Sequence, residues 1–290
     1  MADRLLIFRA PARGQGMGNM LQGLATAMLL SEQYGRTLCV WWKLFEHGYA
    51  RRDGSACPSK AEVYAPLPSS QTALLAADAW LELWDSGPTT PEREWRRVLA
   101  SSARAVVVVG NLLLAPSHRR AAAFESAFTP TEALAALLQR ERARRRVAHL
   151  RVGDVGESAR RGIFAEAGAW RSLRAHLPRD TYVVSDSEEC YRELRGFASP
   201  AWGAQPHSAS VQSIAASSTS IIRSWAEWNV LRQSTILFHT PSAFSETAWL
   251  FSSSIESRCV LHNTSALRAC TKQLDTSDTW DYSSSERYEL

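Results

Sequence analysis

Short apolar segments, separated by stretches with helical periodicity, recur along the whole sequence. Most of these segments lack an alternation of apolar and polar residues, so both faces of each expected strand must be buried. Strands of this kind are typical of parallel sheets that carry helices on both faces. The expected strands are Leu5–Arg9, Thr37–Trp42, Arg104–Val109, Val147–Arg151, Thr181–Ser185, Thr235–His239 and Arg258–His262.

Helical patterns fill most of the intervals between these strands. The expected helices are Asn19–Tyr34, Thr131–Arg146, Ala165–His176, Glu188–Arg195 and Ser242–Ser252. Alternation at this spacing predicts βαβ units and an α/β fold. The length of 290 residues suits one large unit or two domains. We place a domain boundary near residue 140, where an arginine-rich helix end runs into a new strand.

Three segments do not fit this alternation. Glu46–Ser70 and Ser199–Ser220 are rich in residues that favour loops, and we expect both to be irregular. The tail after Lys272 is polar, and we expect it to be frayed or to face solvent.

Charge and composition exclude several classes of protein. The 33 basic and 29 acidic residues give a net charge of +4, which is too balanced for a dedicated nucleic-acid binder. No segment approaches the ~20 apolar residues needed to span a bilayer, and we expect no signal peptide at the start. The five cysteines are scattered, which argues against a zinc site or a disulfide scaffold. One pair, such as Cys259 with Cys270, could still form a disulfide.

The first candidate site is the glycine-rich segment Gly14-Gln15-Gly16-Met17-Gly18-Asn19, between the first strand and the first helix. Glycines at such a turn let the backbone approach a ligand, and free N–H groups at a helix start favour an anion. The spacing differs from the dinucleotide-binding fingerprint. The segment is therefore either a ligand-binding loop or simply a tight turn.

The second candidate site is His149-Leu150-Arg151-Val152-Gly153-Asp154, where the fourth expected strand ends. Alternate residues of a strand share a face, so His149 and Arg151 project the same way. Arg151 can neutralise a pyrophosphate with two parallel hydrogen bonds, and His149 can bond to a base or a sugar. Alternatively, an Arg–Asp ion pair caps the strand.

The third candidate site is Thr240-Pro241-Ser242-Ala243-Phe244-Ser245, which follows a strand and opens a helix. The hydroxyls of Ser242 and Ser245, together with free backbone amides, could hold a phosphate. The alternative for Ser242 is an ordinary helix N-cap. We interpret Asp186 as the cap of the helix that begins at Glu188, and not as part of a metal-binding acidic motif.

These three motifs, in this order, resemble the fucosyltransferase superfamily of GT-B fold, which includes α-1,2-, α-1,6- and protein O-fucosyltransferases. The matching segments are Gly16-Met17-Gly18-Asn19, His149-x-Arg151-x-x-Asp154 and Ser242-Ala243-Phe244-Ser245. The resemblance implies two Rossmann-like domains with mostly parallel sheets that face a cleft. Residues 1–140 would form the acceptor side, and residues 141–290 would bind the nucleotide sugar.

The resemblance also implies roles for single residues. Arg151 would bind the β-phosphate of GDP-fucose, and His149 would contact the nucleotide. The turn with Ser242, Phe244 and Ser245 would complete the phosphate site, and Asp154 would support Arg151 or the acceptor side.

Two further contacts follow from the same resemblance. Glu227 would accept hydrogen bonds from guanine, while Gly16, Gly18 and Asn19 would close over the donor. Two positions depart from the family pattern: Glu227 stands where aspartate is usual, and Ala243 replaces a serine.

The implied reaction is transfer of fucose from GDP-fucose to a hydroxyl of a glycan or protein, with inversion and without a metal or cofactor. Such an enzyme would act in fucose metabolism and protein glycosylation. Glu157 is our candidate for a general base. The alternatives are a non-catalytic carbohydrate- or nucleotide-binding scaffold, and a transferase that uses another nucleotide sugar. We expect a cytoplasmic protein as the sequence stands, or a Golgi or ER protein if an N-terminal membrane anchor precedes it.

Overall fold

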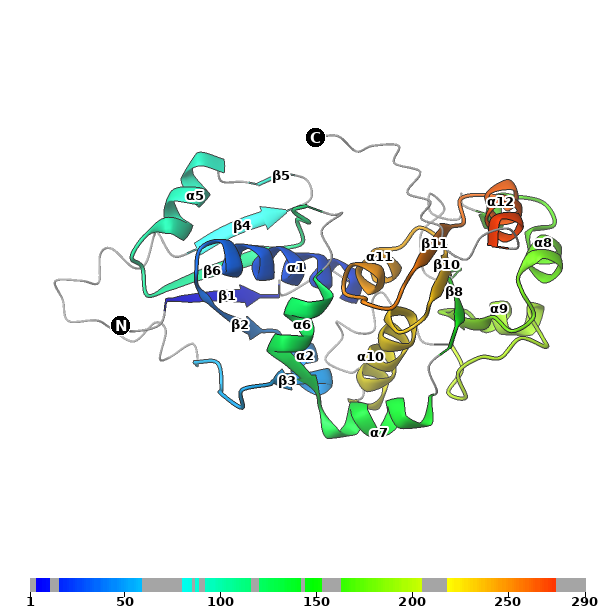
Figure 1. The fold of residues 1–290 in the computed structure, drawn as a ribbon, viewed down its shortest axis with the longest axis horizontal. Coiled ribbons are helices and arrows are strands. Elements are labelled where there is room, and N and C mark those ends of the chain that lie inside the picture. Colours follow the sequence, from blue (N-terminus) through cyan, green and yellow to red (C-terminus); the bar gives the residue numbers. More distant parts are fainter. Residues whose placement is uncertain are drawn as a thin grey trace.

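Two sheets lie side by side along the long axis of the molecule (Figure 1). The computed structural model describes residues 4–10, 16–58, 80–84, 87–88, 92–115, 120–141, 144–152, 163–204 and 218–274. The first sheet has the strand order β2-β1-β6-β4-β5, and the second has the order β11-β10-β8-β9. The proposed domain boundary near residue 140 falls between the strands of the two sheets.

Parallel pairing dominates both sheets, as the sequence predicts. The first sheet contains β1 (Leu5–Arg9), β2 (Thr37–Trp41), β4 (Trp80–Trp84), β5 (Gly87–Pro88) and β6 (Ala105–Gly110). The second contains β8 (Arg146–Leu150), β9 (Tyr182–Ser185), β10 (Ile236–His239) and β11 (Ser257–Val260). Only the β4–β5 pair is antiparallel among these described pairs. All seven expected strands are present, and the predicted α/β class is confirmed.

A separate antiparallel pair joins β3 (Tyr49–Arg51) to β7 (Phe128–Pro130). The helices are α1 (Met17–Gln33), α2 (Lys43–Gly48), α5 (Glu92–Ala100), α6 (Ala121–Ala127), α7 (Glu132–Arg140), α8 (Ala169–His176), α9 (Glu188–Glu193), α10 (Ser218–Arg232), α11 (Ala243–Leu250) and α12 (Thr264–Leu274), with a 3-10 turn at Ile163–Ala165.

Two predicted helix bounds are wrong. The helix predicted at Thr131–Arg146 ends at Arg140, because Arg146 already belongs to β8, where its guanidinium bonds Asp180 at 2.6 Å. The helix predicted at Ala165–His176 starts only at Ala169. Its N-cap, Gly168, has a φ of +83°, a left-handed conformation that separates the helix from the 3-10 turn before it.

The irregular segments contain more regular structure than predicted. The start of Glu46–Ser70 holds the end of α2 and all of β3, and α10 begins at Ser218 within the expected loop Ser199–Ser220. Helix α12 extends past Lys272 to Leu274. The rest of the tail, and residues 59–70 and 205–217, lie outside the described residues.

Helix α1 is central to the packing between the two sheets (Figure 1). It packs against the first sheet on one side and against α11 on the other, and most of its residues are buried. Gly23 allows the contact with the sheet, since a Cβ there would lie 2.1 Å from the carbonyl oxygen of Gly110. On the far side of the second sheet, α8, α9 and α12 cover a separate core, and a Cys259–Cys270 disulfide joins β11 to α12.

A cluster of aromatic rings fills the space between the two halves of the chain. We call it the aromatic cluster; it consists of Trp42, Phe45, Tyr49, Phe124, Phe128, Trp225, Trp228 and Phe251. Neighbouring ring centroids lie 4.9 to 6.4 Å apart, mostly in edge-to-face or tilted pairs. The hydroxyl of Tyr49 donates to Asn229 Oδ1 at 2.8 Å, so a buried polar bond also crosses from β3 to α10.

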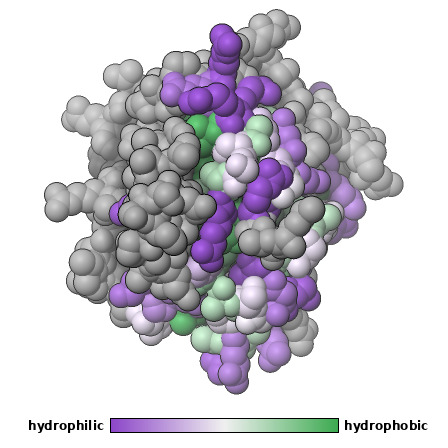
Figure 2. Space-filling model, turned by 90° about the vertical axis from the view of Figure 1, so that its left-hand side faces the viewer, coloured by the Kyte–Doolittle hydropathy of each residue, from purple (hydrophilic) through white to green (hydrophobic). Residues whose placement is uncertain are grey.

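The surface at the first-sheet end of the molecule is more hydrophilic than the space between the two halves. In the view of Figure 2, which looks onto that end of the molecule, hydrophilic side chains dominate among the described residues. Hydrophobic side chains are scattered between them. A further buried apolar cluster, of Ile7, Cys39, Ala105, Val107 and Val109, lies on the first sheet itself.

Candidate functional site

Three neighbouring parallel strands of the second sheet end at the same edge, and the candidate site is built on the residues that follow them. Arg151 follows β8, Asp186 follows β9 and Thr240 follows β10. The N–H of Thr240 donates to the carbonyl oxygen of His149 at 3.1 Å, and the N–H of Arg151 donates to Thr240 Oγ1 at 2.9 Å. Ligands of open α/β sheets bind at this edge.

Asp186 joins the ends of two of these strands. Its Oδ1 accepts the N–H of Val152 at 2.8 Å, and its Oδ2 lies 3.9 Å from Nε of Arg151. The Asp186 side chain is 1% exposed, whereas that of Arg151 is 24% exposed, so the guanidinium can still meet a ligand. The buried carboxylate is therefore an ionic partner of Arg151, for which the sequence predicts a role in phosphate binding.

The interpretation of Asp186 as a helix cap is wrong. The N-cap of α9 is Ser187, and the carboxylate of Asp186 bonds toward β8 instead. The position of Asp186 could have indicated its role, because Asp186 directly follows the correctly predicted strand Thr181–Ser185. The structure places this strand beside the strand that precedes Arg151.

His149 and Ser245 form a buried pair beneath the start of α11. His149 Nδ1 lies 2.5 Å from Ser245 Oγ, and neither residue is exposed. The His149 ring also packs against Phe244, with ring centroids 5.4 Å apart. The predicted contact of His149 with a nucleotide stays a prediction. Its observed contacts fix the first turn of α11.

Ser242 is the N-cap of α11, as the simpler interpretation of its sequence predicts. Its Oγ accepts the N–H of Phe244 at 3.2 Å. The hydroxyls of Ser242 and Ser245 both have partners within the protein, so any role of this turn in binding an anion would depend strongly on backbone N–H groups.

The glycine-rich segment meets this turn from the other half of the chain. A Cβ on Gly18 would lie 2.4 Å from the backbone nitrogen of Phe244 and 2.6 Å from the carbonyl carbon of Ala243. The starts of α1 and α11 are therefore in backbone contact. Gly16 is the N-cap of α1, and Asn19, in its first turn, is partly exposed. Gly14, Asp154 and Glu157 lie outside the described residues.

Glu227, on α10, lies on the Asp186 side of the site. Its carboxyl group has no exposed surface, and its Oε1 accepts the N–H of Trp202 Nε1 at 3.1 Å. Burial raises the pKa of Glu227 well above its ordinary value, and the charge of Asp186 acts in the same direction, while the hydrogen bond from Trp202 opposes them. The sequence offered no signal for Trp202, which lies in an irregular loop.

Replacing Glu227 with glutamine should change how stability depends on pH. In the unfolded wild-type chain Glu227 loses its proton near pH 4.5, whereas the folded chain retains it to higher pH. Its contribution to stability is therefore fully present below pH 4.5 and is lost as pH rises toward the folded pKa, by up to about 1.4 kcal/mol per pH unit. Glutamine does not titrate. The stability of Glu227→Gln relative to wild type should therefore increase as the pH is raised from about 4, near the unfolded pKa of glutamate, to about 7.

Urea unfolding at a series of pH values measures this difference. Glu94→Gln, on the exposed side of α5, is the control for loss of a carboxyl group and should leave the pH profile unchanged. Parallel profiles for wild type and Glu227→Gln would contradict the prediction.

Within the described residues, His, Cys, Asp and Glu side chains do not gather into any group of three that could hold a metal ion. In the same part of the chain, every helix is too short or too polar to cross a bilayer.

No protein-family profile matches the sequence, and no curated protein matches it significantly. Solved structures do match. A variant of Arabidopsis thaliana FUT1 in complex with GDP superposes with a TM-score of 0.54 at 12% identity, over 90% of this chain and 71% of that one. The fucosyltransferase NodZ from Bradyrhizobium matches with a TM-score of 0.48 at 14% identity, over 87% of this chain and 94% of NodZ. With its two mostly parallel sheets, the chain therefore has a GT-B fold similar to that of the fucosyltransferases.

Proposed function

We propose that this protein is a glycosyltransferase that moves fucose from GDP-fucose to a hydroxyl of a glycan or protein, with inversion and without a metal ion. The proposal rests on two contacts at one edge of a parallel sheet: Arg151 bonds to Thr240, two residues before the N-cap of α11, and Gly18 touches the first turn of α11. The fold supports it, since the FUT1 structure that shares this fold contains GDP.

The first step is binding of the donor. The guanidinium of Arg151, held by Asp186, grips the β-phosphate with two parallel hydrogen bonds. The start of α11 supplies backbone N–H groups and the positive end of a helix dipole. From the other half, Gly16 and Asn19 lie at the start of α1 and close over the sugar.

Guanine recognition falls to Glu227. Its acidic side chain is the hydrogen-bonding partner that a guanine edge requires. Because Trp202 donates to one of its oxygens in this structure, the base either uses the other oxygen or displaces Trp202. His149 acts through Ser245 by holding the turn in place.

The chemical step requires that GDP leave with a growing negative charge. Fixed cations and backbone amides stabilise that charge when they are oriented before the reaction begins. Arg151 is prepared in this way, since Asp186 contacts it from a buried position. Asp154 supports Arg151 or the acceptor side, and Glu157 takes the proton of the acceptor hydroxyl.

Calorimetric titration of the full chain with GDP, GDP-fucose and UDP tests the proposal. We expect GDP and GDP-fucose to bind and UDP to bind much more weakly. If none of the three binds, the chain is a scaffold on a glycosyltransferase fold. If UDP binds as well as GDP, the donor is a different nucleotide sugar. Either result would contradict the proposal.

A further inference from the structure

The edge of the first sheet is covered in an uncommon way. Within the described residues strand β2 pairs with β1 alone, so side chains meet the backbone groups on its other side. Arg51 Nη1 donates to the carbonyl oxygen of Leu38 at 2.5 Å, and the N–H of Val40 donates to Sγ of Cys57 at 3.3 Å. The indole N–H of Trp41 donates to the carbonyl oxygen of Pro58 at 2.9 Å. A cysteine sulfur thus takes the place of a backbone carbonyl at this edge.

A second cysteine lies directly beside the first. Cys39 is buried in β2, and Cys57 is partly exposed in the segment that follows β3. Cys57 packs against the buried apolar group that contains Cys39. Arg51 Nη1 lies 3.7 Å from Sγ of Cys39, and the guanidinium also acts on Cys57. The pair therefore combines one accessible sulfur, one buried sulfur and a positive charge.

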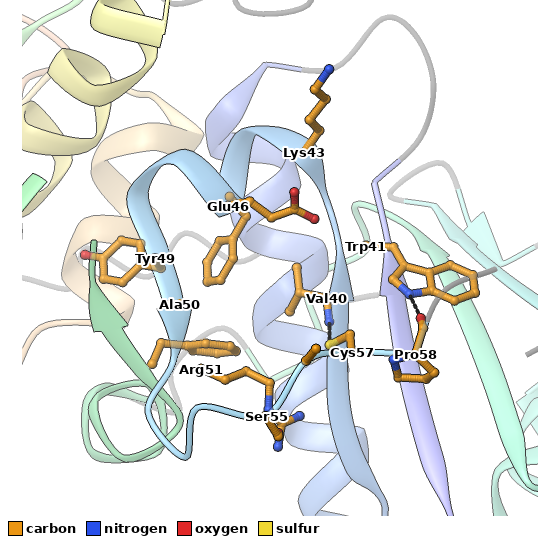
Figure 3. A pocket seen from close by; sticks show the side chains of 13 residues that line it. Val40, Trp41, Lys43, Glu46, Tyr49, Ala50, Arg51, Ser55, Cys57 and Pro58 are labelled. Carbon is orange, nitrogen blue, oxygen red and sulfur yellow. Dashed lines mark hydrogen bonds between the residues drawn. The ribbon is translucent and has the colours of Figure 1, made fainter. Parts of the chain in front are cut away.

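A cavity of about 610 Å³ borders Cys57 (Figure 3). Its charged lining residues are Lys43, Glu46 and Arg51, and Arg51 is also paired with Asp53 at 2.7 Å. The cavity therefore gives a small molecule access to Cys57 without a strong excess of one charge in its wall.

The electrostatic surroundings give the two thiols different roles. The hydrogen bond from Cys39 lowers the pKa of Cys57, and the N–H of Val40 and the charge of Arg51 act in the same direction against the effect of burial. The pKa of Cys39 is raised by the same hydrogen bond and by burial. Since the thiolate is the nucleophile, Cys57 is the sulfur that attacks and Cys39 is the one that keeps its proton.

We propose that Cys57 is a thiol–disulfide exchange site for small disulfides such as glutathione disulfide, and that Cys39 resolves the product to an internal disulfide. The Cys57 thiolate attacks one sulfur of the disulfide, which forms a mixed disulfide and releases one thiolate. Cys39 then attacks Cys57 Sγ as its own proton is lost, the Cys39–Cys57 bond forms, and the second thiol leaves. The small disulfide is reduced to two thiols, and both cysteines are oxidised.

The remaining cysteines provide internal controls. Cys190 is fully buried, and burial raises its pKa to about 12. Cys259 and Cys270 are already joined to each other. Reaction with small disulfides should therefore be confined to the Cys39–Cys57 pair.

Intact-mass analysis of the folded full chain after exposure to glutathione disulfide tests the proposal. In Cys39→Ser the mixed disulfide cannot be resolved, so this variant should gain the mass of one glutathionyl group, located at Cys57 by peptide mapping. Wild type should gain no glutathionyl group and should lose two free thiols. Absence of the adduct in Cys39→Ser would overturn the proposal, and so would a stable glutathionyl group on Cys57 of wild type.

Two further variants keep the test independent of any effect of Cys39→Ser on folding. Cys57→Ser should remain free of adduct at Cys39, and Cys190→Ser should behave as wild type. With iodoacetamide at pH 7, Cys57 of wild type should react at least roughly tenfold faster than Cys190. Equal rates at the two positions would contradict the assignment of Cys57 as the attacking sulfur.

Discussion

Replacing Arg151 with lysine is expected to lower fucose transfer from GDP-fucose by roughly 10²–10³-fold, the loss seen when a fixed donor to a developing negative charge is removed. Lysine keeps the positive charge but lacks the planar fork that makes two parallel hydrogen bonds to phosphate. It also cannot reproduce the Nε contact with Asp186, 3.9 Å away, that orients the guanidinium. Steady-state turnover of GDP-fucose by the purified variant, with kcat and KM determined separately, measures the loss.

Arg146→Lys is the matched control for this experiment. Arg146 lies on the same strand, β8, but its partner Asp180 is more than half exposed. Ion pairs of that kind contribute about 0–1 kcal/mol to stability. The control should therefore fold and turn over substrate like wild type, and near-wild-type turnover by Arg151→Lys would rule out the phosphate-binding role of Arg151.

Replacing Gly18 with alanine is expected to separate α1 from α11. The added methyl group would lie 2.4 Å from the backbone nitrogen of Phe244, and no side-chain rotation can relieve a clash with backbone. Inserting a methyl group into packed structure costs about 1–3 kcal/mol. Because the displaced turn supplies the backbone N–H groups proposed to bind phosphate, the loss in GDP binding free energy should exceed the loss in the free energy of unfolding. Urea unfolding and calorimetric titration with GDP measure the two effects.

Gly54→Ala is the control for a glycine-to-alanine change. Gly54 has a φ of +69° and no atom within 4 Å of its would-be Cβ. Alanine there adds backbone strain of about 1–2 kcal/mol without any clash, so it should reduce stability but leave GDP affinity intact. Unchanged stability and unchanged GDP affinity in Gly18→Ala would refute the close contact of the two helices.

Seven strands of the two main sheets could be predicted, because burial on both faces is visible in the sequence as an apolar run, whereas β4 and β5 were missed. Segments such as Ala105–Gly110 are buried at every position and contain few polar residues. Helix α10 could not be found in the same way. Seven consecutive residues, from Trp225 to Leu231, are buried, so the helix has no polar stripe to mark its period. Strands β3 and β7 are too short to show any period.

Part of the candidate site was also accessible from the sequence. Two helix starts could be predicted, one from Gly16 and Gly18 and the other from the serine after Pro241. The structure brings these two starts together. The partner of Glu227 was not accessible, because Trp202 reaches it from an irregular loop that leaves no local pattern in the sequence. Asp186 was misinterpreted as a helix cap, although its place directly after a predicted strand was visible.

The aromatic cluster has a practical consequence for anyone who would divide this protein. Its rings come from both sides of residue 140, so a fragment cut there would carry half of an apolar interface into water. Exposed patches of this kind promote aggregation. Chimaeras that exchange one half of the chain for that of another protein of this fold should therefore keep Trp225, Trp228 and Phe251 together with Phe45, Tyr49 and Phe124, since the two sets pack against each other.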